Sequence, residues 1–201
     1  MKPESSKLDD YLAADEVVDW RHSAVQAKAQ PIVAGVANNI DKARLLFDWV
    51  RDEIPHSEDI ESDVVTCSAS EVLSAGTGIC FAKSHLLAAF LRSVGIPAGF
   101  CYQVLRRDPP FEGLVLHGLN SVFLPSLEKW FRVDPRGNTG DINAQFSTER
   151  EQLAFPMDAA AGEFIHETIY CSPAKVVVEV LTRFDSRTAM WPHLPSGLGN
   201  G

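Results

Sequence analysis

The sequence has little of what marks an exported, membrane-bound or nucleic-acid-binding protein. Its N-terminus, MKPESSKLDDYL, has no apolar run behind a basic head, and no segment reaches the roughly 18 apolar residues of a membrane span. Lys and Arg number 18 against 27 Asp and Glu, and they form no block that could bind phosphates or an anionic membrane. We therefore expect a cytoplasmic protein whose partners include neither nucleic acids nor membranes.

Cysteine is also scarce. The four cysteines, Cys67, Cys80, Cys101 and Cys171, are scattered and include no CxxC pair. This spacing argues against zinc and dithiol redox centres, and thiols in the cytoplasm normally stay reduced. We expect no metal and no cofactor, and we interpret Cys67, Cys101 and Cys171 as small buried hydrophobes.

The length and composition predict one folded unit. The chain has 201 residues, of which 45% are hydrophobic, enough for one domain with a substantial core. We expect a single domain over residues 1–201, with an N-terminal helical segment (1–38), a core (39–135) and a C-terminal extension (136–201). The extension ends in a stretch from Pro195 that reads as a flexible tail.

Helical periodicity dominates the first half of the chain. It predicts a helix or a pair of helices over about Asp9–Ala29, and single helices over Asn39–Glu53, Ala69–Ser74 and Cys80–Val94. Pro31 interrupts the first segment. Ser68 and Glu71 form a capping box before the third helix, and Gly95 suits the C-terminal cap of the fourth.

The second half favours extended structure. Segments rich in Val, Phe, Tyr and Leu predict strands over Ala98–Leu105, Gly113–Leu124 and Lys129–Asp134, joined into an antiparallel sheet. Beyond Pro135 the pattern is weaker. It indicates a loop at 137–145, a short helix over Thr148–Leu153, and either a strand or a helix over Ala174–Leu181.

Cys80 stands at the head of the fourth predicted helix, directly behind the glycine-rich Ala75-Gly-Thr-Gly78. A helix N-terminus has unpaired N–H groups and a positive dipole end, so a thiol placed there loses its proton more easily. A thiol nucleophile also needs an imidazole and a group that orients the imidazole. His117 in the middle strand and Asp134 at the end of the next can meet across the hairpin. The pattern therefore indicates a Cys–His–Asp triad.

The other histidines fit this chemistry less well. His85 follows Cys80 by five residues, more than one helical turn, so we expect it to point away from the thiol. No pattern supports the remaining four, which we interpret as surface or loop residues: His22, His56, His166 and His193.

Five segments together resemble the transglutaminase-like superfamily. In chain order they are Ser68-Ala-Ser-Glu-Val-Leu73, Gly78-Ile-Cys80, Leu91-Arg-Ser-Val-Gly-Ile-Pro-Ala98, His117 and Lys129-Trp-Phe-Arg-Val-Asp-Pro135. The resemblance implies an α+β fold with a papain-like/transglutaminase-like core, in which N-terminal helices, with the nucleophile cysteine at a helix N-terminus, pack on an antiparallel β-sheet. It also implies Cys80 as nucleophile, His117 as base and then acid, and Asp134 as the orienting group.

Two positions depart from that family pattern. Many members carry a tryptophan two residues after the histidine, where this chain has Leu119, and an arginine after the Gly-Ile-Pro-Ala turn, where it has Gly99. The triad is intact, but these differences affect the contacts expected with a substrate. The backbone N–H of Cys80 could help to hold an oxyanion, while Trp49, Gln103 and Asn120 remain unranked as sources of a second donor.

The sequence thus predicts a cysteine-dependent acyl-transfer enzyme acting on peptide or side-chain amides through a thioester acyl-enzyme. We expect peptide or protein substrates and favour hydrolysis over transfer to an amine. The alternative is a non-catalytic binding module that keeps the fold, although such a module has no need for the three triad residues together. The oligomeric state stays open.

Overall fold

The computed structural model describes residues 1–199 and centres on a four-stranded sheet. The strand order is β4-β3-β2-β5, and every neighbouring pair is antiparallel. These strands are β2 (Ala98–Arg106), β3 (Leu114–Leu124), β4 (Lys129–Val133) and β5 (Phe164–Ile165). The three predicted strands are confirmed, with ends that differ by at most one residue. The short strands β1 (Lys2–Pro3) and β6 (Thr168–Ile169) pair with each other in parallel.

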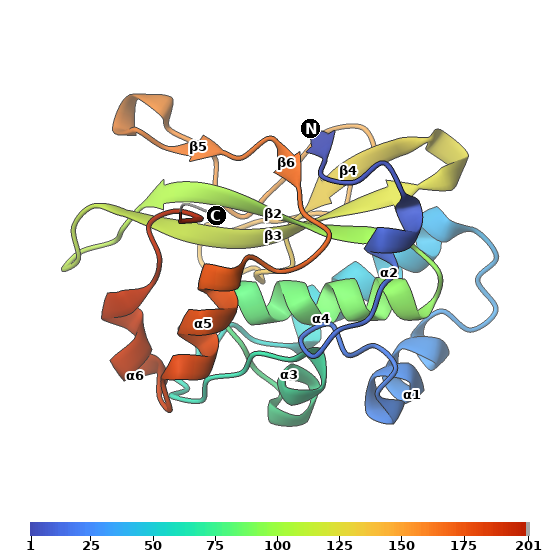
Figure 1. The fold of residues 1–201 in the computed structure, drawn as a ribbon, viewed down its shortest axis with the longest axis horizontal. Helices are drawn as coiled ribbons and strands as arrows, with labels where there is room; N and C mark the ends of the chain where they lie inside the picture. Colours follow the sequence, from blue (N-terminus) through green and yellow to red (C-terminus); the bar gives the residue numbers. More distant parts are fainter. Residues whose placement is uncertain (200–201) are drawn as a thin grey trace.

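Helices cover one face of this sheet, and one of them is central. The helices are α1 (Ser23–Ile32), α2 (Asn39–Glu53), α3 (Ala69–Ala75), α4 (Cys80–Ser93), α5 (Lys175–Arg183) and α6 (Arg187–Met190). Helix α4 runs along the sheet, with α1 and α3 on its other side (Figure 1). Every residue from Phe81 to Arg92 is buried, as expected for a helix enclosed on all sides.

Local capping explains where several helices begin. The Asn38 side chain accepts a hydrogen bond from the Asp41 N–H and so caps α2. The capping box predicted from Ser68 and Glu71 is present at α3. Helix α3 ends at Gly76, whose φ of +67° is the left-handed conformation that glycine adopts without strain. The chain can therefore turn sharply between α3 and the start of α4.

The polar side chains buried along α4 bond mainly to backbone carbonyls. Arg92 is the most extensive case, because its guanidinium donates to the carbonyls of Ala98 at 2.8 Å, Ala13 at 2.7 Å and Cys171 at 2.6 Å. Burial lowers the pKa of Arg92 to about 10, mainly because the charge is removed from water. One side chain thus connects the central helix with the start of β2 and with two segments that are distant in the chain.

The N-terminal segment differs from its predicted form. Of the helix or helix pair predicted over Asp9–Ala29, the chain forms two separate pieces, a 3₁₀ turn at Leu8–Tyr11 and then α1, which begins at Ser23. Pro31 does not interrupt this helix, because it lies in the last turn of α1. The intervening stretch is held in turns instead, with the Asp15 carboxylate accepting hydrogen bonds from two following N–H groups.

The C-terminal extension contains one wrong prediction and one resolved alternative. The helix predicted over Thr148–Leu153 is absent, because the chain turns at Ser147, whose hydroxyl accepts the N–H groups of Glu149 and Arg150, and then folds back so that the Gln145 N–H donates to the Gln152 carbonyl at 3.0 Å. The apolar run Ala174–Leu181, left open between strand and helix, forms helix α5. Its buried residues Val177, Val180 and Leu181 follow helical spacing.

Gly118 lets the start of α4 approach β3 closely. A Cβ atom at this position would lie 2.5 Å from Cδ1 of Phe81, the residue that follows Cys80. The absence of a side chain on the residue after His117 therefore allows the beginning of α4 to pack against the strand.

We expect Gly118→Ala to lower the free energy of unfolding by about 1–3 kcal/mol, because the added methyl group overlaps Phe81 and forces the helix and strand apart. Chemical denaturation monitored by circular dichroism measures this change. Gly197→Ala is the matched control, since a Cβ there meets nothing within 4 Å. Equal stabilities of the two variants would contradict this account of the packing.

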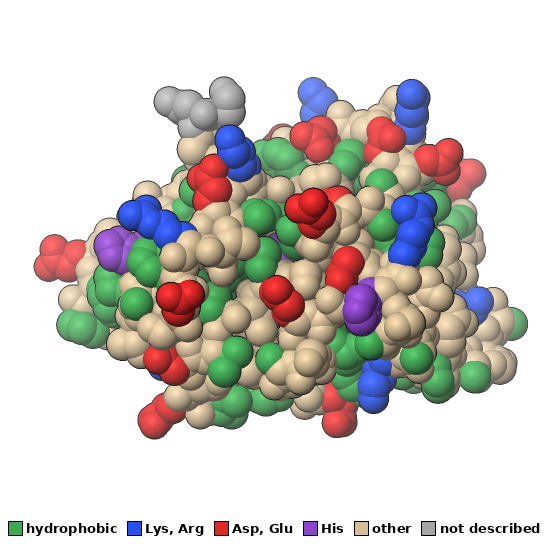
Figure 2. All heavy atoms as spheres, turned by 60° about the horizontal axis from the view of Figure 1, so that its bottom comes forward, with side chains coloured by type: hydrophobic (Ala, Val, Ile, Leu, Met, Phe, Trp, Pro, Cys, Tyr) green, Lys and Arg blue, Asp and Glu red, His purple; other side chains and the backbone are tan. Residues whose placement is uncertain are grey.

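Charge is dispersed over the helical side of the molecule. On the face shown in Figure 2, acidic side chains are separated by uncharged atoms, so the net charge of −9 is not gathered there into one patch. Within residues 1–199, none of the helices combines the length and the hydropathy that crossing a membrane requires.

Candidate active site

Cys80, His117 and Asp134 come from three elements that meet at one pocket. Cys80 is the first residue of α4, His117 lies in β3, and Asp134 directly follows β4. His117 Nε2 and Asp134 Oδ2 are 2.8 Å apart. Cys80 and His117 both line the pocket. The structure therefore brings the imidazole to the carboxylate and places the thiol in the same cavity.

The strand register explains how Asp134 reaches His117. In the β3–β4 ladder, Val133 pairs with Asn120, so Asp134 lies one residue beyond the last pair. It is offset diagonally from His117 rather than directly opposite, a separation that side chains on neighbouring strands can bridge. Asp134 is fully buried and His117 is 5% exposed, so water does not separate the two groups.

The backbone holds the Asp134 carboxylate in place. The N–H of Arg136 donates to Oδ1 at 3.1 Å, and the N–H of Ala154 donates to Oδ2 at 3.0 Å. Burial alone would raise the pKa of Asp134, but His117 and these two N–H groups outweigh it and lower the pKa. Asp134 therefore stays ionised and keeps the imidazole ring in one orientation.

His117 is held in its charged form. Burial alone would lower its pKa, but the Asp134 carboxylate and the Cys80 side chain outweigh burial and raise the pKa to about 10. Because Asp134 occupies Nε2, Nδ1 is the ring nitrogen left to interact with a group in the pocket that Cys80 and His117 line. The raised pKa means that the imidazole keeps its proton near neutral pH and can act as an acid there.

The C-terminal extension supplies parts of the site that the sequence did not reveal. Besides the N–H of Ala154, it contributes Phe155, whose ring packs edge-on against His117 with centroids 5.0 Å apart. A main-chain N–H has no residue-type signature, so Ala154 could not have been found from sequence. Arg136 is also at the site, where it binds Asp59 through two hydrogen bonds of 2.6 and 2.7 Å. Its only sequence signal is its place two residues after Asp134.

His56 is not the surface residue that the sequence suggested. It is 5% exposed and lines the pocket together with Cys80 and His117. Burial, reinforced by the positive charge of Arg136, lowers the pKa of His56 well below its usual value. It is therefore a neutral ring, and its Nδ1 accepts a hydrogen bond from the Glu58 N–H. A histidine directly after a proline in a polar loop gives no sequence signal for such burial.

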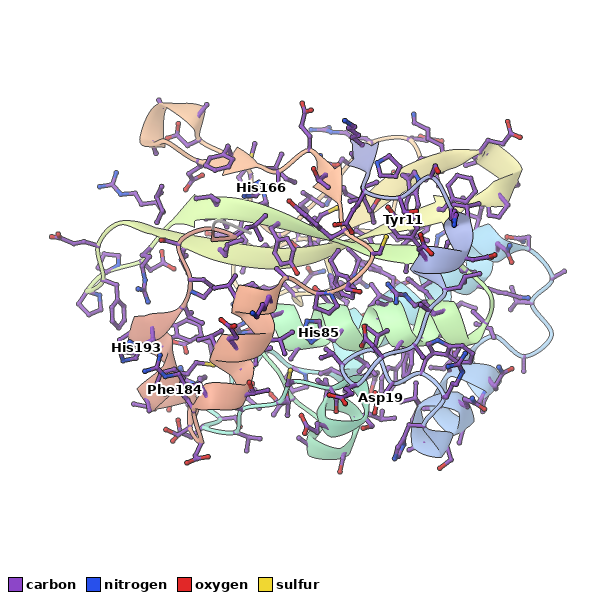
Figure 3. The ribbon with its side chains drawn as sticks, in the orientation of Figure 1. Tyr11, Asp19, His85, His166, Phe184 and His193 are labelled. Carbon is purple, nitrogen blue, oxygen red and sulfur yellow. The ribbon has the colours of Figure 1, made fainter. Side chains whose placement is uncertain are left out.

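His85 points away from the thiol, as predicted. Its Nδ1 bonds to the carbonyl of Cys67 at 2.7 Å, and its ring lies beneath the sheet on α4 (Figure 3). Burial lowers the pKa of His85 to about 4, so the ring is neutral and donates this hydrogen bond. His166 is half-buried near β5, and His193 stacks on Phe184 with centroids 5.1 Å apart.

The other cysteines differ from Cys80 in burial. Cys67 and Cys101 are buried, as predicted, and burial raises the pKa of each to about 12. Cys171 is only half-buried, so the prediction of a fully buried residue is wrong there. Its pKa is also raised, mainly by burial.

Lys83, in the first turn of α4, connects the start of this helix to α2. It is fully buried, and its ammonium donates to the carbonyls of Arg51 and Ile54, which lie at the C-terminal end of α2. A cation is favourable at that end of a helix dipole. Burial, together with the charge of Arg136, lowers the pKa of Lys83 to about 7. The contact ties the first turn of α4 to α2.

The pocket has a volume of about 460 Å³ and a mixed lining. Phe155, Pro156, Trp191 and Leu194 supply apolar wall, and charged residues also line it, including Arg107. The Arg107 guanidinium donates to the carbonyls of Trp191 and Pro192, which fixes the C-terminal segment beside the pocket.

The first residue of the predicted flexible tail is hydrogen-bonded to the sheet. This residue, Pro195, accepts a hydrogen bond of 2.7 Å from the N–H of Leu116, the residue before His117. The start of the tail is therefore bonded to the strand that carries the imidazole. The last two residues of the predicted tail, 200 and 201, lie outside the described residues.

The three residues left unranked as oxyanion donors are engaged elsewhere. The amide of Asn120 donates to the carbonyls of Ser84 and Gly99, and that of Gln103 donates to the carbonyl of Phe155 at 3.2 Å. Trp49 packs its ring against Phe90. The N–H groups of the first turn of α4 are the donors that the helix itself leaves unpaired.

The two departures from the family pattern have local explanations. Leu119 belongs to a small buried cluster with Tyr11, Cys101 and Ile169, so the N-terminal segment covers this position. At Gly99, a Cβ atom would lie 2.5 Å from a methyl group of Ile169 and 2.8 Å from the carbonyl oxygen of Tyr170. The residues around β6 thus leave no room for an arginine.

Comparisons with known proteins agree with this architecture. A family model described as the transglutaminase-like superfamily matches residues 26–135. The comparison with curated proteins found no match.

Several solved structures are similar to this chain, including the following two. A candidate cysteine protease from Cytophaga hutchinsonii has a TM-score of 0.53 at 17% identity, covering 66% of this chain and 43% of its own. A candidate protease from Parabacteroides distasonis has a TM-score of 0.42 at 14% identity, covering 61% of this chain and 24% of its own. This chain thus corresponds to less than half the length of either protein. The family match and the first structure confirm the predicted α+β fold.

Proposed function

Because the chain belongs to the transglutaminase-like superfamily, we propose that it is a cysteine-dependent enzyme that attacks peptide or side-chain amides through a thioester acyl-enzyme. Cys80 is the nucleophile, His117 the base and then the acid, and Asp134 the orienting group. One observation carries the proposal: His117 is bonded to Asp134 at 2.8 Å in the pocket that Cys80 lines.

Acylation uses the proton held by His117. The Cys80 sulfur attacks the carbonyl carbon of the amide, and its own proton resides on the imidazole. When the C–N bond breaks, His117 gives this proton to the departing nitrogen, which leaves as an amine or ammonia. The acyl group stays on sulfur as a thioester, and the ionised Asp134 stabilises the charged imidazole throughout.

Deacylation reverses the roles of the same groups. The now neutral His117 takes a proton from a water molecule, and the resulting oxygen nucleophile attacks the thioester carbonyl. The C–S bond breaks, releasing a carboxylic acid and restoring the sulfur–imidazole pair. During both steps, negative charge develops on the carbonyl oxygen, and the unpaired N–H groups at the start of α4 are placed to stabilise it.

The pocket lining favours water over an amine as the acceptor. Transfer to an amine needs a site that limits water, whereas hydrolysis needs only a hydrated pocket. Charged residues such as Glu58, Arg106 and Asp108 line the pocket beside its apolar wall, so water that solvates them has access to the thioester. We therefore favour hydrolysis as the second half of the reaction.

Incubating the protein with a glutamine-containing peptide and a labelled primary amine separates the two outcomes. We expect ammonia or cleaved peptide to be released without incorporation of the label, because water reaches the thioester first. Mass spectrometry of the peptide and an ammonia assay measure the products. Label on the peptide would instead establish transfer, and the Cys80→Ala variant provides the blank for both readings.

A further inference from the structure

A second pocket lies next to the candidate active site. It has a volume of about 370 Å³ and is formed by Gln103 of β2, Ile165 of β5 and the loop 151–157. Phe155 and Pro156 line both this pocket and the one that contains Cys80. These two residues therefore form part of the wall of both pockets, so a ligand in the second pocket lies next to the candidate active site.

Gln103, which lines this pocket, has a hydrogen-bond acceptor that is buried and unused. The residue is 1% exposed, and it pairs with His117 in the β2–β3 ladder. Its Nε2 donates to the Phe155 carbonyl at 3.2 Å, while its Oε1 has no hydrogen-bond partner among residues 1–199. A buried amide oxygen without a donor is unfavourable, so the site is suited to a ligand that brings an N–H group.

The charge of the pocket favours a cationic donor. Among the described residues that line the pocket, Glu151 is the one that carries a charge. Its partner Arg132 lies 3.5 Å away, longer than a normal charged hydrogen bond, and the Glu151 side chain is 44% exposed. The carboxylate is therefore open to a second cation, and the net charge of −9 attracts basic peptides to the molecule as a whole.

The remaining lining suits an aliphatic stem. Leu153, Pro156, Met157 and Ile165 supply apolar surface in the same pocket as Gln103 and Glu151. Lysine and arginine combine such a stem with a donor-rich cationic end.

We propose that this second pocket binds a basic side chain of the peptide substrate, close in sequence to the amide that Cys80 attacks. Gln103 Oε1 accepts a hydrogen bond from the cationic end, and Glu151 contributes the opposite charge. This assignment rests on the proposed function, because it makes Gln103 and Glu151 specificity-determining residues of the same enzyme.

Binding and turnover of matched peptides test the assignment separately. Each peptide carries lysine, norleucine or glutamate at the position next to the reactive amide. One set of three places this residue on the N-terminal side of the amide, and a second set places it on the C-terminal side. Fluorescence anisotropy with the inactive Cys80→Ala protein measures binding without chemistry. We expect the lysine peptide to bind roughly three- to tenfold more tightly than the norleucine peptide, and the glutamate peptide to bind most weakly.

Substitutions then assign the preference to the pocket. In the Cys80→Ala background, Glu151→Gln is expected to weaken lysine-peptide binding roughly two- to fivefold, and Gln103→Leu roughly three- to tenfold, with norleucine-peptide binding unchanged. Glu149→Gln is the control, because Glu149 is exposed on the same loop but does not line the pocket. Thermal unfolding shows whether the Gln103→Leu variant is folded. If that variant does not fold, the Glu151→Gln variant still tests the assignment.

The outcomes separate the two proposals. Equal binding of lysine and norleucine peptides, or a lysine preference that survives Glu151→Gln, overturns the pocket assignment even if the wild-type protein turns the peptides over. A lysine preference that depends on Glu151, in a protein with no turnover of any peptide, supports the pocket and overturns the enzymatic function.

Discussion

Replacing Cys80 with alanine is expected to reduce turnover of an amide substrate by about 10³-fold or more, because no other group at the site can form the thioester. The fold should be unaffected, since Cys80 is only half-buried at the start of α4. Steady-state kinetics with the substrate that the glutamine-peptide assay identifies measures the loss. The same effect is expected from Cys80→Ser, because a serine hydroxyl is a far weaker nucleophile than a thiolate.

Cys171→Ala is the matched control for this substitution. Cys171 is also half-buried and free, but it does not line the pocket. We expect full activity in this variant. Retention of turnover by Cys80→Ala would contradict the assignment of Cys80 as the nucleophile. Absence of turnover in the wild-type protein would favour the alternative of a non-catalytic binding module.

Chemical labelling tests the reactivity of Cys80 independently of turnover. Iodoacetamide near neutral pH should modify Cys80 first, because Cys67 and Cys101 are buried and their pKa values are raised to about 12. Peptide mapping by mass spectrometry identifies the modified site. Faster modification of any other cysteine would count against Cys80 as the nucleophile.

Asp134→Asn is expected to produce the second largest effect, a loss of about 10²- to 10⁴-fold in kcat. The amide has nearly the same shape as the carboxylate but carries no charge to stabilise the imidazolium. Its nitrogen would also face the N–H groups of Arg136 or Ala154, which donate to the carboxylate in the native site. The ring of His117 would therefore lose both its orientation and its charge partner.

The pH profile separates this effect from simple destabilisation. Asp134 is a main cause of the raised pKa of His117, so its loss lowers that pKa. Activity that requires the protonated imidazole is lost as pH rises through this pKa, and the basic limb of kcat/KM should move to lower pH in Asp134→Asn. Asp141→Asn, at an exposed loop position, is the control. An unmoved basic limb would show that Asp134 does not act through His117.

The sequence predicts the residues of the site that act through their side chains and are marked by their residue type. Capping at Ser68, the glycines before Cys80 and the apolar pattern of α4 place the thiol at a helix start, and strand periodicity places His117 and Asp134 on neighbouring strands. These are local signals, so one chain is enough to interpret them.

The other residues of the site could not be predicted for physical reasons. Ala154 acts through its main-chain N–H, and Phe155 acts by its position over His117, so neither is marked by its residue type. His56 looks like a solvated loop residue, because its burial depends on segments distant in the chain. The predicted helix at 148–153 is absent because the chain folds back after Ser147, and Gln152 pairs with Gln145 instead of continuing a helix.

The Arg92 guanidinium, bonded to carbonyls before α1, in β2 and after β6, has a consequence for local opening. If the segment around Ala13 or the one around Cys171 detached alone, the buried Arg92 guanidinium would lose a hydrogen-bond acceptor, which is strongly unfavourable. The segments around Ala13 and Cys171 should therefore open only together with the central helix. Amide hydrogen exchange at both places should follow the global unfolding of the molecule rather than fraying of its ends.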